Sequence, residues 1–375
     1  MRVLIDAVLG PSHPRGVGRY VLELAGHVQR SGEAEVALAI APWHRAFYAP
    51  LVADGVALTE VRVSRRRGVR HAWHAWSAGR LARSIGADII HVPDRMPVIW
   101  PAGRPIVATI HDAIEIDQPD AFGALQLRYR RWALRDQIRR ATQIIAPSSF
   151  SAERIAAVDP SAVPRTTVVH HGAGLEPGQV RQDPAQLRDR PFVLFVGAVQ
   201  RHKAVPNLVR AFLALDRADT DLVIAGATHN DEAAVATAAA GDPRVIRLTD
   251  PTDADLEWLY RNARLLAMPS RYEGFCIPLV EAMQFGCPVI AAHAGAMPEI
   301  CGDAALMFPP TDEAALTRQL ALVLSDESLR ARLAAAGRQH AAAFSWARAA
   351  RETLAVYRAA LELYRVAPDA SASRR

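Results

Sequence analysis

Two glutamates are the residues whose spacing first suggests chemistry. Glu273 and Glu281 lie in the stretch RYEGFCIPLVEAM, with seven residues between them, Gly274 beside the first and Pro278 ahead of the second. Proline is tolerated in the first turn of a helix, where its missing N–H would lack an intrahelical partner anyway, so we expect a loop that runs into a helix. The free N–H groups of a helix start bind anions, and a glycine lets the chain pass close to a ligand. The pattern therefore fits a phosphate at the helix start, with one carboxylate for each sugar of a nucleotide sugar.

Taken alone, the same two glutamates also fit a purely structural interpretation. Glu281 would complement the positive end of the helix dipole, and Glu273 would be a solvated loop residue. For two isolated glutamates this interpretation is favoured, so other features of the sequence have to decide.

Two glycines near the start of the chain form a second candidate site. In GPSHPRGVGRY, Gly16 and Gly18 could bring backbone amides close to phosphates before a helix that begins at about Arg19. The stretch fails as a dinucleotide fingerprint, because the third glycine would have to stand at Val21 and the loop is too long for the tight turn. A dinucleotide-dependent oxidoreductase is therefore disfavoured.

His111 is a candidate because of its position. It follows the apolar run IVATI at the carboxyl end of a predicted strand, where ligands bind in open parallel sheets. A lone histidine is more often structural, and Asp112 beside it could simply cap a turn. The strand-end position favours a site role for His111 and leaves Asp112 open.

Eleven short apolar runs indicate the fold class. They are VLIDAVL, EVALAIA, DIIHV, IVATIHD, QIIAPS and TTVVHHG, then PFVLFVG, DLVIAG, RVIRLT, RLLAMPS and PVIAA. Each is followed by a turn and a longer helical pattern, and strands without polar alternation form parallel sheets that are buried on both faces. The class is therefore α/β, and each half of the chain holds about six strands, the size of a doubly wound domain.

A polar stretch with two prolines, EPGQVRQDPAQLRDR, separates the two series of strands. At 375 residues the chain exceeds the size at which one core stops growing, so two domains and a connection are expected. We expect a Rossmann-like domain at 1–175, a linker at 176–190 and a second such domain at 191–345. A helix at about 346–366 should pack back on the first domain, and 367–375 should be disordered.

The composition is that of an ordinary globular protein with excess basic charge. Half of the residues are apolar, 22% are charged, and the formal net charge of +5 favours anionic partners. No apolar run of signal-peptide length begins the sequence, and the three cysteines contain no C-x-x-C pair, so a cytoplasmic protein is expected. No helix-turn-helix, zinc-finger or aromatic RNA-binding motif appears, and nucleic acid is not expected as a partner.

The densest basic run is SRRRGVRHAWHAW, in which four arginines precede two tryptophans between Arg65 and Trp76. This mixture suits a segment that contacts an anionic membrane surface. A solvated basic loop followed by a helix with ordinary core tryptophans suits it equally well, and the sequence leaves both interpretations open.

A resemblance over most of the chain favours the chemical interpretation of the glutamates. EGFCIPLVEAM, followed by FGCPVIA and MPEICGDAALMF, resembles the E-x7-E donor-binding region of glycosyltransferase family 4. GVGRY, ATIHD, APSSFS, VVHHG, FVLFVG with the lysine after it, and LYRNARLLAMPS follow in the family's order and roughly at its spacing. The resemblance implies the GT-B fold, with an N-terminal acceptor-side domain and a C-terminal donor-binding domain facing across a cleft. It also implies transfer with retained anomeric configuration.

Carried over to this chain, the resemblance implies donor contacts from residues around the helix start. The hydroxyls of the donor sugar would be held by four successive residues, Glu273, Gly274, Phe275 and Cys276. Two amides would face the diphosphate, those of Ile277 and Leu279, and Glu281 would bind the ribose.

The resemblance also implies the groups that act on the reacting bond. Lys203 would be the cation on the leaving diphosphate. The family commonly has an arginine directly after the strand-ending glycine or directly before the lysine; here Ala198 and His202 stand there, which leaves Arg201 as the second cation. The family places the histidine that matches His111 beside the donor's sugar and phosphate. The predicted catalytic residues are thus His111, Lys203, Arg201 and Glu273.

No metal or other cofactor is expected. A D-x-D pair holds a metal in many transferases of the other main fold, and the match here is Asp253 with Asp255, directly ahead of an apolar helical pattern. That position indicates the start of a helix. We expect cationic side chains and helix-terminal amides to stabilise the departing diphosphate instead. Because no carboxylate is an evident nucleophile, front-face attack is expected, as the resemblance implies.

GVGRY, TIHD and VVHHG together look most like the bacterial mannosyltransferases and rhamnosyltransferases that build O-antigens and exopolysaccharides. GDP-mannose is the expected donor, and a glycan on polyprenyl diphosphate at the cytoplasmic leaflet the expected acceptor. The segment RLTDPTD departs from the family's usual base-reading pattern, so a UDP- or dTDP-sugar remains an alternative. A non-catalytic sugar-nucleotide-binding protein is less favoured, since the predicted site residues are all present.

Overall fold

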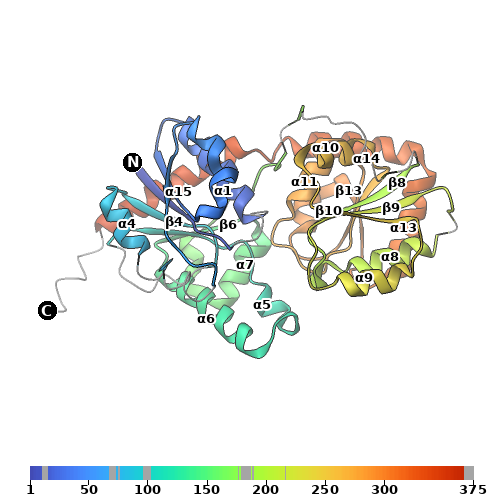
Figure 1. Cartoon of the computed structure of the whole chain (residues 1–375), viewed down its shortest axis with the longest axis horizontal. Helices are drawn as coiled ribbons and strands as arrows, with labels where there is room; N and C mark the ends of the chain where they lie inside the picture. Colours follow the sequence, from blue (N-terminus) through green and yellow to red (C-terminus); the bar gives the residue numbers. More distant parts are fainter. Residues whose placement is uncertain are drawn as a thin grey trace. The chain divides into compact units, whose positions relative to one another are not determined.

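The computed structural model describes residues 1–10, 16–66, 73–74, 77–95, 103–175, 177–178, 187, 190–215 and 217–366. Within these residues the chain forms two compact units, each around its own parallel sheet (Figure 1). Unit 1 is Met1–Gly172 together with the helix Trp346–Val366, and unit 2 is Ala173–Ser345. Most of 176–190 and all of 367–375, which we expect to be linker and disordered tail, lie outside the described residues.

The sheet of unit 1 has seven parallel strands in the order β3-β2-β1-β4-β5-β6-β7. The strands are β1 (Arg2–Ala7), β2 (Glu35–Ile40), β3 (Ala57–Glu60), β4 (Ile89–Val92), β5 (Ile106–Thr109), β6 (Gln143–Ala146) and β7 (Thr166–Val168). The helices are α1 (Val17–Arg30), α2 (Arg45–Tyr48), α4 (Ala78–Ser84), α5 (Ile114–Asp117), α6 (Ala124–Arg140), α7 (Ser149–Val158) and α15 (Trp346–Val366). Short 3-10 turns complete the unit at Pro42–His44, Ala49–Val52, Pro119–Ala121 and Pro160–Arg165.

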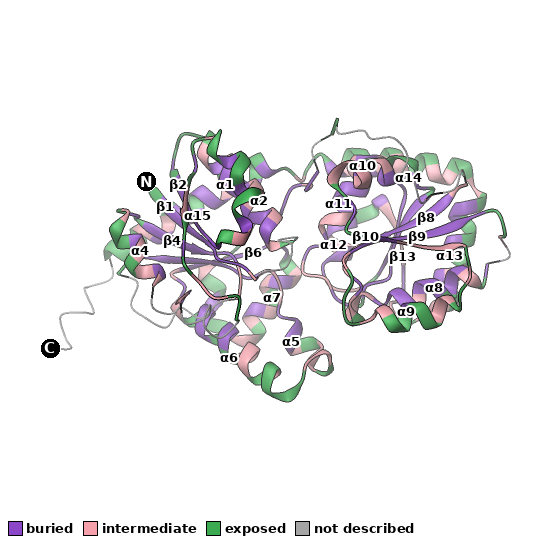
Figure 2. Ribbon diagram, in the orientation of Figure 1, coloured by how far each residue is buried: buried purple, intermediate pink, exposed green. Residues whose placement is uncertain are grey.

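Helices cover both faces of this sheet. Alternate side chains of β1 enter different clusters: Val3 and Ile5 pack with α1 and α15, whereas Leu4 packs on the other face with residues that include Ala82 of α4. Farther along that second face, α6 and α7 pack on β5 and β6. Figure 2 shows the strands in the buried colour between helices with exposed outer faces. This double coverage explains why the strands are continuous apolar runs.

The sheet of unit 2 has six parallel strands in the order β10-β9-β8-β11-β12-β13. The strands are β8 (Phe192–Val196), β9 (Asp221–Gly226), β10 (Val245–Thr249), β11 (Leu265–Met268), β12 (Val289–Ala292) and β13 (Ala305–Phe308). The helices are α8 (Val205–Leu213), α9 (Glu232–Ala239), α10 (Asp253–Asn262), α11 (Ile277–Gln284), α12 (Met297–Cys301), α13 (Glu313–Ser325) and α14 (Glu327–Ala341). Two 3-10 turns lie at Arg201–Lys203 and Gly302–Ala304. The predicted α/β class with two Rossmann-like sheets is confirmed.

Two local expectations need correction, and one is confirmed. β3 and β13 are not among the eleven predicted strands; both are four-residue edge strands, and their side chains are mostly half-buried or exposed. β3 reads ALTE, and because an edge strand pairs on one side only, it needs less of the continuous apolar run that marks a central strand. The first helix begins at Val17 rather than at about Arg19. Pro278 does lie in the first turn of α11, as predicted.

In the described part of the chain, none of the helices combines the length and the apolar character needed to cross a membrane.

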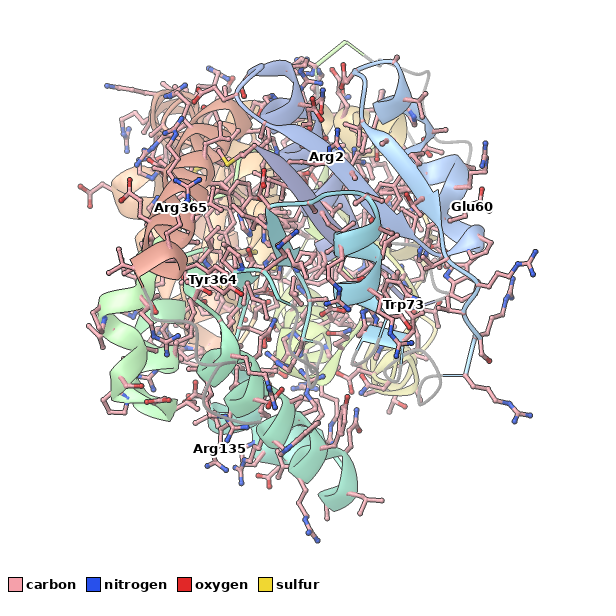
Figure 3. All side chains as sticks on the ribbon, turned by 90° about the vertical axis from the view of Figure 1, so that its left-hand side faces the viewer. Arg2, Glu60, Trp73, Arg135, Tyr364 and Arg365 are labelled. Atoms are coloured by element: carbon pink, nitrogen blue, oxygen red, sulfur yellow. The ribbon has the colours of Figure 1, made fainter. Side chains whose placement is uncertain are left out.

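A hydrogen bond from α15 to the sheet provides a test of how unit 1 is held together. Tyr357 of α15 and Nδ1 of His91 share a hydrogen bond of 2.6 Å, and both side chains are fully buried. Tyr357→Phe would leave a buried nitrogen unsatisfied, so we expect the urea midpoint to fall by the equivalent of about 1–3 kcal/mol. Tyr364→Phe is the matched control, because Tyr364 is an exposed residue of the same helix (Figure 3) and its loss should matter by less than about 0.5 kcal/mol. Equal midpoints for the two variants would contradict the expectation.

Candidate active site

Two donors hold the carboxylate of Glu273. The hydroxyl of Ser270 and the ammonium of Lys203 both donate to Oε1, each at 2.7 Å. Glu273 belongs to the loop between β11 and α11, whereas Lys203 comes from the turn Arg201–Lys203 after β8. β8 and β11 are neighbours in the sheet, so their carboxyl ends bring the two loops together. Only 12% and 14% of the two paired side chains are exposed, which excludes the solvated-loop interpretation of Glu273.

Burial and pairing act on this ion pair in opposite directions. Burial is the largest single effect on Lys203 and would lower its pKa, but the charge and hydrogen bond of Glu273 outweigh it, so the pKa of Lys203 is raised. Burial would likewise raise the pKa of Glu273, but Lys203, His202 and Ser270 together lower it. Both groups are therefore charged at neutral pH.

The backbone around Glu273 is fixed by three loops. The amide of Arg271 donates to the carbonyl of His202 at 2.7 Å, and the amide of Ala296 donates to the carbonyl of Glu273 at 2.9 Å. Gly295 has φ +60°, and a Cβ there would lie 2.5 Å from the carbonyl oxygen of Glu273. Glycine is thus required at that close approach, and the loops after β8, β11 and β12 form one rigid support.

The chain enters α11 through a left-handed residue. Cys276 has φ +75° and is buried, as is Phe275 before it, whose ring contacts Phe344 edge-on at 5.9 Å. The amide of Leu279 donates to the carbonyl of Cys276 at 3.0 Å. The first turn is thus tightened, and the predicted contact of the Leu279 amide with a diphosphate stays a prediction. Ile277 remains at the first helical position.

Glu281 is oriented by a tyrosine that lies 21 residues earlier. The hydroxyl of Tyr260, a fully buried residue of α10, donates to Oε2 of Glu281 at 2.8 Å. Burial raises the pKa of Tyr260 well above its usual value, and the charge of Glu281 adds to this, so the hydroxyl stays protonated. The carboxylate therefore has a fixed orientation, which the sequence could not reveal.

Arg201 and the D-x-D pair occupy different kinds of position. Arg201 is exposed, two residues before Lys203 on the same turn. Asp255 lies in a capping box: its amide donates to the Thr252 hydroxyl at 3.1 Å, and its carboxylate accepts from the Thr252 amide at 2.9 Å. The predicted helix-start role is confirmed. Among the described residues, no three His, Cys, Asp or Glu side chains come together as metal ligands.

In unit 1, His111 lies in a group of aromatic and imidazole rings. Its Nδ1 lies 3.3 Å from Nε2 of His171, which follows β7. The ring of Tyr20 contacts both imidazoles, each at 4.8 Å between centroids. Gly16 and Gly18 stand at the start of α1, Gly16 exposed with φ +66° and Gly18 buried in the first turn.

Burial keeps the histidines of this group neutral. Burial, with the neighbouring His111, lowers the pKa of His91 to about 3, and the same two causes lower that of His171 well below its usual value. Burial also lowers the pKa of His111, although Asp94 and Asp112 act against it. The unit 1 group is therefore uncharged at pH 7, unlike the ion pair of unit 2.

Asp112 both caps a turn and holds an arginine. Its Oδ1 accepts from the amide of Ile114 at 3.2 Å and from Arg95 at 2.8 Å. Burial would raise the pKa of Asp112, but Arg95 brings it down to about 2. Arg95 also pairs with the fully buried Glu115 at 2.8 Å. The turn-capping interpretation of Asp112 is thus confirmed, and the network anchors the loop that follows His111.

The basic run at 65–76 is described only in part, because 67–72 and 75–76 lie outside the described residues. Arg65 is exposed, and its guanidinium lies 5.7 Å from the ring centroid of Trp43. Trp73 is half-buried and packs against an apolar cluster of unit 1 (Figure 3). Trp73 therefore fits the interpretation as a core tryptophan, and contact with a membrane stays a prediction.

Comparison with known families agrees with this architecture. Residues 14–177 match the family described as Glycosyltransferase Family 4, and residues 179–340 match the one described as Glycosyl transferases group 1. Together with the two parallel-sheet units, these matches define a glycosyltransferase of the GT-B type. The chain belongs to glycosyltransferase family 4.

Several curated relatives are similar to this chain. O-antigen chain mannosyltransferase B of Escherichia coli is 27% identical over 267 residues, which is 67% of this chain and 70% of the relative. An MMP alpha-(1->4)-mannosyltransferase of Mycolicibacterium hassiacum is 30% identical over 279 residues, 69% of this chain and 66% of the relative. A D-inositol 3-phosphate glycosyltransferase of Frankia alni is 28% identical over 403 residues, 94% of this chain and 96% of the relative.

Among solved structures, Anabaena HepE in complex with UDP-glucose has a TM-score of 0.74 to this chain. The two are 20% identical, and the match covers 95% of this chain and 99% of HepE. This likeness shows the shared fold.

The neutral histidines predict how stability depends on pH. The pKa of His91 is about 3 when folded and about 6.5 when unfolded, so the unfolded state binds more protons between these values. Stability is thus full above about pH 6.5 and is lost as the pH falls towards 3. From pH 7.5 to pH 5, His91 alone should lower the unfolding free energy by about 2 kcal/mol, seen as a lower urea midpoint.

The pH window separates this effect from that of the carboxylates, which titrate below about pH 5. His91→Gln is the matched variant, since it removes one titrating group and should flatten the pH slope by about one proton. A urea midpoint that does not change between pH 7.5 and pH 5 in the wild-type protein would contradict the expectation.

Proposed function

We propose that the chain is a retaining transferase that moves a hexose from a nucleotide sugar, most specifically mannose from GDP-mannose, onto a lipid-linked glycan. The observation that carries the donor half of this proposal is the shielded Lys203–Glu273 pair beside the start of α11. A pair that is charged at neutral pH, at the carboxyl ends of neighbouring parallel strands, suits a ligand that combines hydroxyls with phosphates.

The geometry of the pair leaves capacity for both parts of such a ligand. Both hydrogen bonds that the described residues make with the Glu273 carboxylate end on Oε1, so Oε2 can accept from a sugar hydroxyl. An ammonium has three N–H donors, and Lys203 uses one of them for Glu273. The other two can be directed to diphosphate oxygens. Glu281, oriented by Tyr260, would accept from the ribose diol.

The chemistry then rests on stabilising the leaving group. As the glycosidic bond breaks, negative charge develops on the diphosphate, and Lys203, Arg201 and the amide of Ile277 would stabilise it. His111 is the catalytic residue proposed from unit 1. The acceptor oxygen attacks the anomeric carbon from the same face from which the leaving group departs. The proton of the acceptor passes to a phosphate oxygen. The enzyme needs no metal in this scheme, and the capping role of Asp255 agrees with that.

Mannose as the transferred sugar is supported by the two relatives that are named mannosyltransferases. The UDP-glucose bound to HepE keeps a UDP-sugar as the alternative. The acceptor, a polyprenyl-diphosphate-linked glycan of an O-antigen or exopolysaccharide, and a peripheral position on the inner face of the plasma membrane are carried over from the resemblance alone.

For the choice of guanine we propose a role for Asp250, which lies in the segment RLTDPTD. Asp250 follows β10, its backbone is left-handed at φ +50°, and its amide lies 3.4 Å from the carbonyl of Gly226. A carboxylate can accept from two adjacent N–H groups of guanine, including its exocyclic amine, whereas uracil presents one N–H flanked by carbonyls that repel it. Asp250 would therefore favour GDP over UDP.

The proposal is tested with a donor panel of GDP-mannose, UDP-glucose, UDP-N-acetylglucosamine and dTDP-rhamnose. We expect GDP-mannose alone to raise the melting temperature and to be hydrolysed slowly, with and without EDTA. Glu281→Ala should abolish the shift, because the ribose contact is lost. Glu327→Ala, an exposed glutamate at the start of α14, is the matched control and should behave as wild type. A response to another donor would overturn the GDP-mannose assignment, and loss of turnover with EDTA would overturn the metal-free scheme.

Base selectivity is tested separately with Asp250→Asn. This change keeps the side chain's shape but makes half of its polar end a donor. We therefore expect GDP to bind about ten- to a hundredfold more weakly, since about 1.5–3 kcal/mol is typical of a charged hydrogen bond. UDP binding should stay the same. Equal losses for GDP and UDP, measured by calorimetry, would show that Asp250 does not read the base.

A further inference from the structure

The chain runs from unit 1 into unit 2 after Gly172 and returns to unit 1 at Trp346. These two residues of unit 1 lie next to each other. A Cβ on Gly172 would lie 2.5 Å from the backbone nitrogen of Trp346, so the two segments are in direct contact. The ring of His171 stacks on the indole of Trp346, with centroids 5.5 Å apart and planes 15° apart. The contact between Gly172 and Trp346, which we call the crossing, together with this stacking therefore fixes the plane of the His171 ring.

His171 in turn contacts His111. Nε2 of His171 lies 3.3 Å from Nδ1 of His111, and burial keeps both imidazoles neutral. A neutral imidazole has one N–H donor and one acceptor nitrogen. A hydrogen bond between them needs one ring to donate and the other to accept, so the tautomers of His171 and His111 are coupled. His111 also has a hydrogen bond with the backbone of Pro93.

A third ring closes the group from the side. Tyr20 contacts His111 and His171 with its ring, and its hydroxyl shares a hydrogen bond of 2.8 Å with Thr109. Thr109 shares another, also of 2.8 Å, with His91. Tyr20 is thus hydrogen-bonded to the sheet, and its ring limits rotation of both imidazoles.

We infer that His171 is a positioning residue that helps to define the tautomer and ring orientation of His111, and that the contact of Gly172 with Trp346 holds His171 in place. This inference rests on the proposed function, in which His111 is a catalytic residue. His171 itself acts only through His111.

The first test compares His171→Phe with His171→Gln. Phenylalanine keeps a flat ring for Trp346 to stack on but removes the nitrogen, so we expect kcat to fall about a hundredfold with the donor KM unchanged. Glutamine restores a polar group that can donate or accept, and should recover at least about tenfold of that loss. His27→Phe, the same change at a half-buried histidine of α1, is the matched control and should keep wild-type kcat. Wild-type kcat in His171→Phe would overturn the inference.

The second test reads the tautomer directly and needs no donor. Long-range 15N NMR of histidine-labelled protein, assigned with His111→Gln, reports which nitrogen of His111 carries the hydrogen. We expect one defined tautomer in the wild-type protein and a changed or averaged pattern in His171→Phe. An identical His111 signal in both proteins would overturn the inference. If no donor is turned over by the wild-type enzyme, the proposed function fails, and this measurement still decides whether His171 positions His111.

The third test disturbs the crossing without touching a nitrogen. In Gly172→Ala the added methyl group meets the backbone of Trp346, so the stack under His171 must shift. We expect the His111 signal to change as in His171→Phe. Gly123→Ala is the matched control, because a Cβ there meets nothing within 4 Å. An unchanged His111 signal in a folded Gly172→Ala protein would show that the crossing does not hold His171.

Discussion

A parallel sheet covered by helices on both faces leaves its carboxyl edge as the place where polar side chains can face a ligand. Both units obey this constraint. In unit 2, Lys203 and Glu273 follow neighbouring strands, and in unit 1, His111 and His171 follow β5 and β7. The loops at this edge are themselves packed, so each polar group there must find a partner or remain a buried, unsatisfied group. The hydrogen bonds and ion pairs that satisfy these polar groups therefore determine the geometry of each site.

The Lys203–Glu273 pair shows how the requirement is met with charges. Removing either charge from water costs free energy, and mutual attraction offsets the cost only when the geometry is good and further hydrogen bonds help. Ser270 supplies such a bond to the same oxygen, and the contact between the Arg271 amide and the His202 carbonyl fixes the distance between the loops. The pair is therefore held in place by contacts within unit 2.

The sequence allows a feature to be predicted when the residues that form it lie close together along the chain. Local chemistry was readable: apolar runs predicted the central strands, and Pro278 predicted the start of α11. Edge strands such as β3 carry a weaker pattern. Partnerships between distant residues left no local signal, so Tyr260, which orients Glu281, and His171 beside His111 could not be found from spacing. The individual site roles rest on resemblance and remain predictions.

The two units solve the same problem with different physics, and the difference has a chemical consequence. In unit 2, Lys203 and Glu273 each carry a full charge, so each acts strongly on a charged or polar group that lies beside it. The neutral imidazoles of unit 1 exert no net charge, so their influence on a ligand is confined to one N–H and one lone pair at fixed angles. A group of that kind is useful only if its tautomer and plane are defined. In the proposed scheme, His111 therefore depends on a second imidazole and on the ring of Tyr20, whereas Lys203 depends on a counter-charge.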